Sequence, residues 1–381
     1  MPTELDADLP TDPPADASAG RYAHPPGSEL TLETDRLIAG RYRIESRLAR
    51  GGQAAVYLAY QEPLNRPVAL KILSPPPHAS PEDVRAFQQR FLLEAKTLAG
   101  LSHPNIVVVF DYGEISAGSF YIAMEYVDGK RYSDVLRERP FDPARNLGLC
   151  YQVGEALQYA HRRGVIHRDI KNSNILVKEE DGRSVVKVVD FGIVKLVESD
   201  PELTQHGVIL GSPHFMAPEQ ARGGQVTHST DQYALGVMLF CGLVGRYPFD
   251  GPNSTAILTS HVIDPVPGFR EKHRRCRVTP ALETVVQRVL SKDPEDRYAD
   301  MNGLLAALRP FVDGDQPVVS GSLPTDNPET TGAQRVAVAA PAPAPAPAPP
   351  APDDRYRTLV VVLLGLIFLA LAALVGVLLL R

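Results

Sequence analysis

The feature that most constrains the fold is a pair of apolar segments joined by a two-residue turn. The segments GVIHRDIKNSNILV (164–177) and VVKVVDFGIVK (185–195) flank the dipeptide Asp181-Gly182. Because Asp-Gly favours the tight turn that joins two antiparallel strands, we expect a β-hairpin here. The hairpin would bring Asn174, near the start of the first strand, close to Asp190, at the end of the second. The polar side chains at its open end are therefore expected to form a site.

These polar side chains suit a magnesium site. Asn174 and Asp190 supply an amide oxygen and a carboxylate, and Asp169 adds a second carboxylate nearby in the chain. Mg²⁺ prefers hard oxygen ligands and leaves positions open for substrate phosphates. The sequence thus predicts a metal site that also handles phosphate.

A lysine and a glutamate upstream of this region form a candidate ion pair. VALKI (68–72) alternates as a strand and puts Lys71 on the face opposite its larger apolar residues. The amphipathic segment 80–101 follows as a helix capped at Ser80, and Glu94 lies on its apolar stripe. A carboxylate on a buried face needs a cationic partner, so we expect Glu94 to pair with Lys71. Taken alone, a strand lysine is more often simply solvated.

The order of several motifs identifies a family. VALK (68–71), HRDIKNSN (167–174), DFG (190–192), MAPEQ (216–220) and DQYALGVML (231–239) follow one another with the spacing of the eukaryotic-type (Hanks-type) protein kinases. The chain resembles these kinases between about residues 42 and 311, and in particular their bacterial membrane-anchored members. The resemblance implies an α+β, two-lobed fold, with a β-rich N-lobe over about 42–126 and an α-helical C-lobe over about 127–311.

The resemblance also implies catalytic roles. Lys71 would hold the α- and β-phosphates of ATP, with Glu94 fixing its position, and Asp169 would accept the proton of the substrate hydroxyl. Asn174 and Asp190 would bind Mg²⁺, with Mn²⁺ as an alternative metal. Two further positions resemble the serine/threonine kinases. Lys171 would neutralise charge near the transferred phosphoryl group, and Ser212 stands where that class usually carries a threonine that bonds the catalytic aspartate.

The nucleotide pocket can be assigned in the same way. The resemblance places its ATP-contacting residues in a covering loop, on a strand and in a hinge: Leu48, Ala49, Arg50, Gly51, Gly52, Val56, Ala69, Lys71, Glu94, Met124, Glu125 and Val127. For Met124, plain core packing is an equally good and compatible interpretation. The covering loop LARGGQAAV (48–56) departs from the family pattern, because Ala49 and Ala54 replace two glycines. A methyl group there restricts the backbone and its approach to phosphate, which would stiffen the loop or weaken ATP binding.

Other motif residues are expected to be structural. The resemblance pairs Glu219 with Arg297, and it makes Asp231 an anchor for the backbone of the catalytic loop. His167 would pack beneath that loop rather than act as a base.

Regulation is expected at the segment between Asp190 and Glu219. Arg168 beside Asp169 is a site where an arginine can pair with a phosphate on this segment. Thr204 is its only threonine and our candidate autophosphorylation site, with Ser199 as the second choice. An ordinary loop hydroxyl is the equally weighted alternative for Thr204.

Composition divides the rest of the chain. Residues 1–41 are rich in Pro, Asp and Ala and are expected to be a disordered tail, and 312–357 form a Pro/Ala-rich linker. The net charge of −6 argues against a nucleic-acid partner, because there is no basic excess to neutralise phosphates. The three cysteines are widely separated, which fits a reducing compartment and predicts neither a zinc site nor a disulfide framework.

The C-terminal segment predicts a membrane anchor. Residues 359–380 carry no charge, and a helix of this length, about 33 Å, can cross a hydrocarbon core of about 30 Å. We therefore expect a transmembrane helix over 358–380. Arg355 and Arg357 before it predict that the rest of the chain is cytoplasmic. A buried core helix would need protein around its whole circumference and is disfavoured. Ala372 and Gly376 could pair two such helices, although lipid-facing packing is the better interpretation.

These features predict a membrane-tethered, ATP-dependent serine/threonine protein kinase acting on protein substrates, with homodimers as the unit of trans-autophosphorylation. The alternative is a membrane-anchored pseudokinase scaffold. It is disfavoured because Lys71, Asp169 and Asp190 are all present. A small-molecule kinase of related fold is disfavoured by the MAPEQ segment, which suits a peptide substrate.

Overall fold

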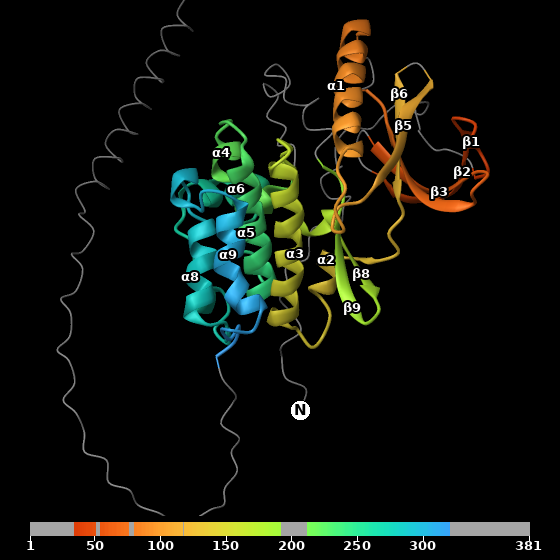
Figure 1. Cartoon of the computed structure of the whole chain (residues 1–381). Helices are drawn as coiled ribbons and strands as arrows, with labels where there is room; N and C mark the ends of the chain where they lie inside the picture. Colours follow the sequence, from red (N-terminus) through yellow and green to blue (C-terminus); the bar gives the residue numbers. More distant parts are fainter. Residues whose placement is uncertain (1–33, 51–53, 76–79, 117, 192–211, 321–381) are drawn as a thin grey trace, which may run out of the picture. The chain divides into compact units, whose positions relative to one another are not determined.

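The computed structural model describes residues 34–320, except 51–53, 76–79, 117 and 192–211 (Figure 1). The chain divides into two compact units, 1–322 and 323–381, and the fold below belongs to the first. The predicted membrane segment and Thr204 lie outside the described residues. Within these residues, no helix combines the length and the apolarity that crossing a bilayer requires.

A six-stranded antiparallel sheet forms the first lobe (Figure 1). Its strands run in the order β1-β2-β3-β4-β6-β5. They are β1 (Leu37–Ile38), β2 (Tyr42–Arg50), β3 (Ala54–Gln61), β4 (Arg66–Leu73), β5 (Val109–Ser116) and β6 (Ser119–Glu125). One apolar cluster lies on this sheet and includes Tyr42, Tyr57 and Leu70. The predicted β-rich N-lobe is confirmed.

Helix α1 (Pro81–Ala99) packs on this sheet and begins where the sequence predicted. The Ser80 hydroxyl accepts a hydrogen bond from the Asp83 backbone N–H, and the Asp83 carboxylate accepts one from the Ser80 N–H, a reciprocal capping box. The Phe87 and Phe91 rings lie 5.7 and 4.9 Å from the Phe120 ring of β6. These contacts fix the helix against the strands that frame the site.

The predicted hairpin is also confirmed. Strands β8 (Ile175–Glu180) and β9 (Arg183–Val188) pair in antiparallel register, and β7 (Lys130–Arg131) adds a third strand. Asp181 and Gly182 have φ angles of 49° and 75°. Two successive positive φ values are what a tight I′ turn requires, which explains the Asp-Gly sequence. The hairpin places the segments before β8 and after β9 at the same end.

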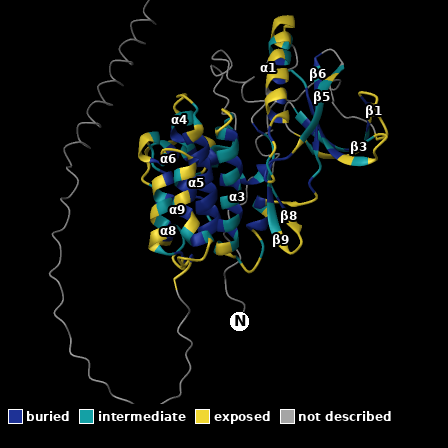
Figure 2. Cartoon of the chain, viewed as in Figure 1, coloured by how far each residue is buried: buried dark blue, intermediate teal, exposed yellow. Residues whose placement is uncertain are grey.

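The second lobe is helical. Its helices are α2 (Tyr132–Val135), α3 (Pro143–His161), α4 (Pro218–Ala221), α5 (His228–Val244), α6 (Ser254–Ile263), α7 (Phe269–Lys272), α8 (Pro280–Val289) and α9 (Met301–Val312). Short 3₁₀ turns lie at Asn172–Asn174, Pro213–Phe215 and Pro294–Asp296. Every residue of α5 from Ser229 to Val244 is buried (Figure 2). A helix that is apolar all round forms the centre of a lobe, and the others surround it.

The ordered structure extends beyond both predicted domain boundaries. Leu37 and Ile38, assigned to the tail, belong to the sheet because β1 pairs with β2. At the other end, residues predicted to start the linker pack on the domain, where Val319 bridges Val278 and Val318 is buried. Composition does not reveal these short pairings, because each depends on a partner elsewhere in the sequence.

Candidate active site

The loop between α3 and β8 is fixed by one buried carboxylate. Asp231, in the first turn of α5, is 1% exposed. Its oxygens accept hydrogen bonds from the backbone N–H groups of His167 (2.8 Å) and Arg168 (2.9 Å), and from His161 Nε2 (2.8 Å). A carboxylate at a helix N-terminus is also favoured by the helix dipole. The predicted role of Asp231 as the anchor of this loop is confirmed.

His167 lies beneath the loop, as predicted. It is fully buried, Nε2 donates to the Val189 carbonyl (3.1 Å), and Nδ1 accepts from the Asp169 N–H (3.3 Å). Its ring lies 4.4 Å from the Phe191 ring. Burial lowers the pKa of His167, which keeps the imidazole neutral. With both nitrogens bonded to the backbone, this histidine is structural.

Asp169 is held by the two polar residues that follow it in the loop. Asn174 Nδ2 donates to the Asp169 carbonyl (2.9 Å) and to Oδ2 (3.1 Å). Lys171 Nζ lies 3.0 Å from the same Oδ2. The ammonium favours the ionised carboxylate, and both contacts fix its orientation. The structure therefore brings together the three residues predicted to be catalytic and presents a carboxylate that can accept a proton.

Asp190 follows β9 in a left-handed conformation, with φ of 57°. Its Oδ1 lies 2.7 Å from Nζ of Lys71, which projects from β4 in the other lobe and is 7% exposed. Burial opposes ionisation of Asp190, but the charge and hydrogen bond of Lys71 outweigh it and lower the pKa of this carboxyl. Asp190 is thus an anion, as a metal ligand must be.

The contact between Lys71 and Asp190 was not predicted. The sequence paired Lys71 with Glu94, whose backbone lies in α1 but whose side chain lies outside the described residues. That pair stays a prediction. The sequence did indicate a functional role for Asp190, because a polar residue there ends an apolar strand. It gave no indication that Asp190 would contact a residue of β4.

An apolar cavity adjoins this ion pair, and both lobes line it. Its lining residues are Lys71, Leu98, Ile106, Val107, Val109, Ile122, Met124, Asp190 and Phe191. Met124 contributes to its wall, as expected for a residue at the rear of a nucleotide pocket. Ala69 pairs with Met124 across β4 and β6, which places the predicted strand residue beside the predicted hinge. Val127 is buried, and the Glu125 carboxylate bonds Lys187 Nζ at 2.9 Å.

The covering loop is described only at its two ends. Ala49 pairs with Val56 and Arg50 with Ala55, so β2 and β3 bring both ends of the loop together. Leu48 lies on the same strand and is 42% exposed. Gly51 and Gly52 lie outside the described residues, so their contact with ATP stays a prediction.

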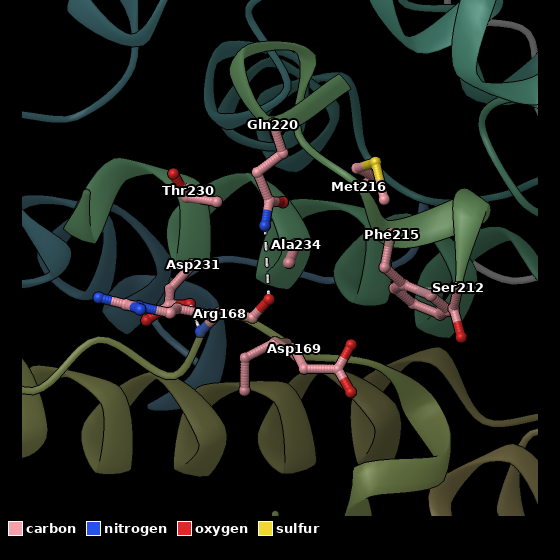
Figure 3. A pocket seen from close by; sticks show the side chains of 10 residues that line it. Arg168, Asp169, Ser212, Phe215, Met216, Gln220, Thr230, Asp231 and Ala234 are labelled. Atoms are coloured by element: carbon pink, nitrogen blue, oxygen red, sulfur yellow. Dashed lines mark hydrogen bonds between the residues drawn. The ribbon is translucent and has the colours of Figure 1, made fainter. Parts of the chain in front are cut away.

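A second cavity is lined by Asp169 (Figure 3). Ser212, Phe215 and Met216 line it together with Asp169. Gln220, which sequence analysis did not single out, spans this region. Its Nε2 donates to the Arg168 carbonyl (3.4 Å), and its Oε1 accepts from the Ala217 N–H (3.1 Å). Gln220 thereby joins the segment of the MAPEQ motif to the loop that carries Asp169.

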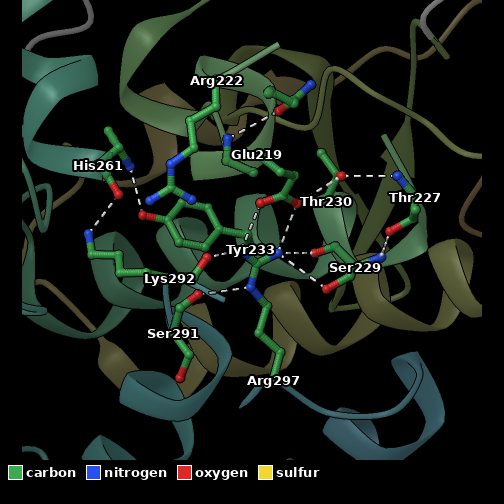
Figure 4. Close-up of polar contacts among 12 residues, drawn as sticks. Glu219, Arg222, Thr227, Ser229, Thr230, Tyr233, His261, Ser291, Lys292 and Arg297 are labelled. Atoms are coloured by element: carbon green, nitrogen blue, oxygen red, sulfur yellow. Dashed lines mark hydrogen bonds and ion pairs between the residues drawn. The ribbon is translucent and has the colours of Figure 1, made fainter. Parts of the chain in front are cut away.

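The predicted pair between Glu219 and Arg297 is confirmed (Figure 4). Arg297 Nη1 and Nη2 donate to Oε1 (2.9 Å) and Oε2 (2.8 Å) of Glu219. Nη1 also donates to the Ser229 carbonyl (2.9 Å), and Thr230 Oγ1 donates to Glu219 Oε1 (3.0 Å). Burial opposes ionisation of Glu219, but the guanidinium outweighs it and lowers the pKa. This bidentate pair fixes α4 to the start of α5.

Comparison with known proteins agrees with this geometry. A family model described as the protein kinase domain matches residues 42–307. This chain belongs to the protein kinase family. The serine/threonine-protein kinase pkn3 of Myxococcus xanthus is 39% identical over 73% of this chain and 52% of its own length. The serine/threonine-protein kinase PrkC of Bacillus subtilis is 37% identical over 73% of this chain and 42% of its own length.

A solved kinase structure has the same fold. The kinase domain of PknI from Mycobacterium tuberculosis matches with a TM-score of 0.57 and 29% identity, over 73% of this chain and 99% of that domain. Among the curated sequences, in contrast, the chain spans about half the length of the relatives that it matches.

The kinase family implies ATP and a divalent metal, and the residues present fit both. Within the described residues, no group of three or more His, Cys, Asp or Glu side chains could hold a metal alone. Mg²⁺ needs no such group, because it is bound by one or two protein oxygens and the substrate phosphates. The Asp190 carboxylate and the Asn174 amide oxygen supply those donors, and Lys71 supplies a cation for phosphate.

Proposed function

We propose that this chain is an ATP-dependent protein kinase that transfers the γ-phosphate of ATP to serine and threonine hydroxyls of proteins. The observation that carries the proposal is the Asp169 carboxylate, held by Lys171 Nζ at 3.0 Å and Asn174 Nδ2 at 3.1 Å. The names of the relatives agree with it, since both are serine/threonine-protein kinases.

Each residue has a distinct part in the transfer. Asp169 orients the substrate hydroxyl and takes its proton as the oxygen bonds to the γ-phosphorus. Lys171 stabilises negative charge on the transferred group, and ADP leaves when the β–γ bond breaks. Asn174 and Asp190 would hold Mg²⁺, or Mn²⁺ as an alternative, and the metal would neutralise charge on the phosphates. Lys71 turns from Asp190 to the α- and β-phosphates.

The test uses the purified full chain in detergent with labelled ATP, Mg²⁺ and a generic protein substrate. We expect label on phosphoserine and phosphothreonine, and its loss in Asp169→Asn, which keeps the side chain's size but removes the base. The exposed Asp134→Asn change is the matched control. If no label is incorporated with either Mg²⁺ or Mn²⁺ across several substrates, the chain is a pseudokinase scaffold instead.

We also propose that the kinase is a single-pass membrane protein with its catalytic domain on the cytoplasmic side. Residues 359–380 support this, with Arg355 and Arg357 before them. The full chain should stay with membranes through alkaline extraction, and deletion of residues 359–380 should release it. Release of the unaltered chain would contradict the anchor.

We further propose that two anchored copies phosphorylate each other at Thr204. Its place between Asp190 and Glu219 supports this, because Arg168 beside Asp169 can pair with a phosphate there. Thr204→Ala should reduce both incorporated phosphate and activity, and the rate of phosphorylation per chain should rise with chain density. Unchanged phosphate and activity in Thr204→Ala would exclude this site.

A further inference from the structure

A compact run of basic side chains lies at the surface of the helical lobe, away from the catalytic residues in sequence. It comprises Arg270, Lys272, Arg274, Arg275 and Arg277 and is called here the α7 basic segment. The four arginines are exposed and Lys272 is half-buried. Glu271 is the one carboxylate among residues 269–277. The segment is therefore strongly cationic in a chain whose net charge is −6.

The nearby carboxylates do not neutralise this charge. Within the described part of the chain, no ion pair involves any of the five basic residues. Glu271 Oε2 instead accepts from the Gly268 N–H (3.2 Å), and Glu283 Oε1 accepts from the Phe269 N–H (2.7 Å). Two arginines of the other lobe differ, since Arg41 and Arg43 lie 3.3 and 3.0 Å from carboxylates. The α7 basic segment is thus free to meet an anionic partner.

The backbone of the segment is fixed to the core. Phe269 is 1% exposed and meets the Phe240 ring of α5 edge-on at 5.0 Å. Cys276 and Val278 are buried as well, and the Cys276 N–H donates to the His273 carbonyl (2.8 Å). Because the backbone is held at three apolar residues, the arginines between them project from a preformed surface.

The chain leaves the domain beside this segment. The Ser320 N–H donates to the Arg277 carbonyl (2.7 Å), and Val319 pairs with Val278. Thirty-eight residues then separate Ser320 from Leu359, where the apolar segment begins. Much of this stretch is Pro/Ala-rich, and such chains extend to about 3.1 Å per residue, so 38 residues can reach about 120 Å. If residues 359–380 are anchored, the linker keeps the α7 basic segment within its reach of the bilayer, about 120 Å at most.

We infer that the α7 basic segment binds anionic lipid headgroups of the membrane in which the chain is anchored. The inference rests on the proposed membrane anchor. Clusters of four to eight Lys and Arg near a bilayer are attracted to anionic lipids, and Val319, 41% exposed, adds an apolar side chain beside the cluster. The acidic residues before β1 are a less suitable partner. Figure 1 places β1 in the other lobe, far from the end of α9, whereas the chain leaves the domain at Ser320, whose N–H donates to the Arg277 carbonyl.

The test uses the full chain in nanodiscs of phosphatidylcholine alone or with about one third phosphatidylglycerol. Hydrogen exchange of the peptide spanning 270–278 is measured by mass spectrometry. We expect the peptide to exchange at least threefold more slowly on the anionic discs. Salt at 0.5 M should remove the difference, because it shortens the screening length to about 4 Å. Arg274→Glu with Arg275→Glu should abolish the difference. The matched control, Arg36→Glu with Arg47→Glu on the exposed face of the other lobe, should retain it.

Flotation of the full chain with neutral vesicles separates the two proposals. If the chain does not float, the anchor is wrong and the lipid contact falls with it. If it floats but the peptide exchanges equally on both discs, the anchor stands and the lipid contact is overturned. A third outcome is exchange that is equal on the two kinds of disc but becomes faster on both in the Arg274→Glu, Arg275→Glu variant. It would identify a protein segment of this chain as the partner. That result also overturns the inference.

Discussion

Lys71 Nζ lies 2.7 Å from Asp190 Oδ1, so an ion pair joins β4 of one lobe to the end of β9 in the other. These are the groups that a phosphate and a metal require. We therefore expect nucleotide binding to exchange this internal ion pair for contacts with ATP and Mg²⁺.

Removing the ammonium tests this exchange. Lys71→Met should lower kcat by about 10²–10³-fold, because a cation aimed at the phosphates is lost. It should also raise the pKa of Asp190, since Lys71 lowers it. Initial rates at saturating ATP, and the pH dependence of Mg²⁺ affinity, measure the two effects. Lys130→Met removes an exposed lysine paired with Glu138 and should leave both unchanged. Near-normal turnover in Lys71→Met would contradict the assigned role.

Gln220 should act as a positioning residue. Gln220→Ala removes the bonds to the Arg168 carbonyl and the Ala217 N–H, each worth about 1 kcal/mol. We expect kcat to fall about 5- to 30-fold with KM for ATP almost unchanged, and the free energy of unfolding to fall by no more than about 2 kcal/mol. Gln220→Glu keeps the acceptor for Ala217 but loses the donor to Arg168, so its kcat should be reduced as well. Exposed Gln89→Ala is the control. If both Gln220 variants lower the free energy of unfolding by as much as they raise the activation free energy calculated from kcat, the residue is merely structural.

The pair between Glu219 and Arg297 should be a major contributor to stability. Either Glu219→Gln or Arg297→Met leaves a buried charge without its partner and should lower the free energy of unfolding by about 3–5 kcal/mol. The double variant should lose less than the sum of the two, because the charges are removed together. Urea unfolding measures all three, with exposed Arg277→Met as a control expected within about 0.5 kcal/mol. Additive losses would rule out coupling.

Buried His261 should make the fold sensitive to acid. Burial, aided by the Lys292 charge, lowers its pKa from 6.5 to about 3. Between these values the unfolded chain binds a proton that the folded chain does not, so stability falls as pH decreases. The loss from this group should reach about 2 kcal/mol at pH 5. His261→Gln should show a correspondingly smaller decrease between pH 7 and 5 in urea unfolding. An equal decrease in both proteins would exclude His261 as the cause.

The parts predicted from sequence are those with local signals or fixed motif spacing. The Ser80 cap, the Asp181-Gly182 turn and the Glu219–Arg297 pair are of this kind. Asp231 was assigned by resemblance, and its three hydrogen bonds agree. Such features need little knowledge of how distant elements pack.

The features that were missed depend on packing between elements. Lys71 contacts Asp190 only because the two lobes pack against each other. The alternation of residues within β4 does not predict this packing. Gln220 reaches Arg168 across a cavity, over 52 positions of sequence. Leu37 and Ile38 form too short a strand to stand out, and only their pairing with β2 makes them part of the sheet.

The three hydrogen bonds to Asp231 also bear on heat inactivation. This carboxylate belongs to α5, the most buried helix, and two of its donors are consecutive amides of the loop that carries Asp169. If the loop unfolded alone, the buried Asp231 carboxylate would lose its hydrogen-bond donors, which costs free energy. The loop is therefore expected to unfold together with α5 and not before it. Catalytic activity and tertiary structure should therefore be lost over the same few degrees, with no temperature range in which the protein is folded but inactive.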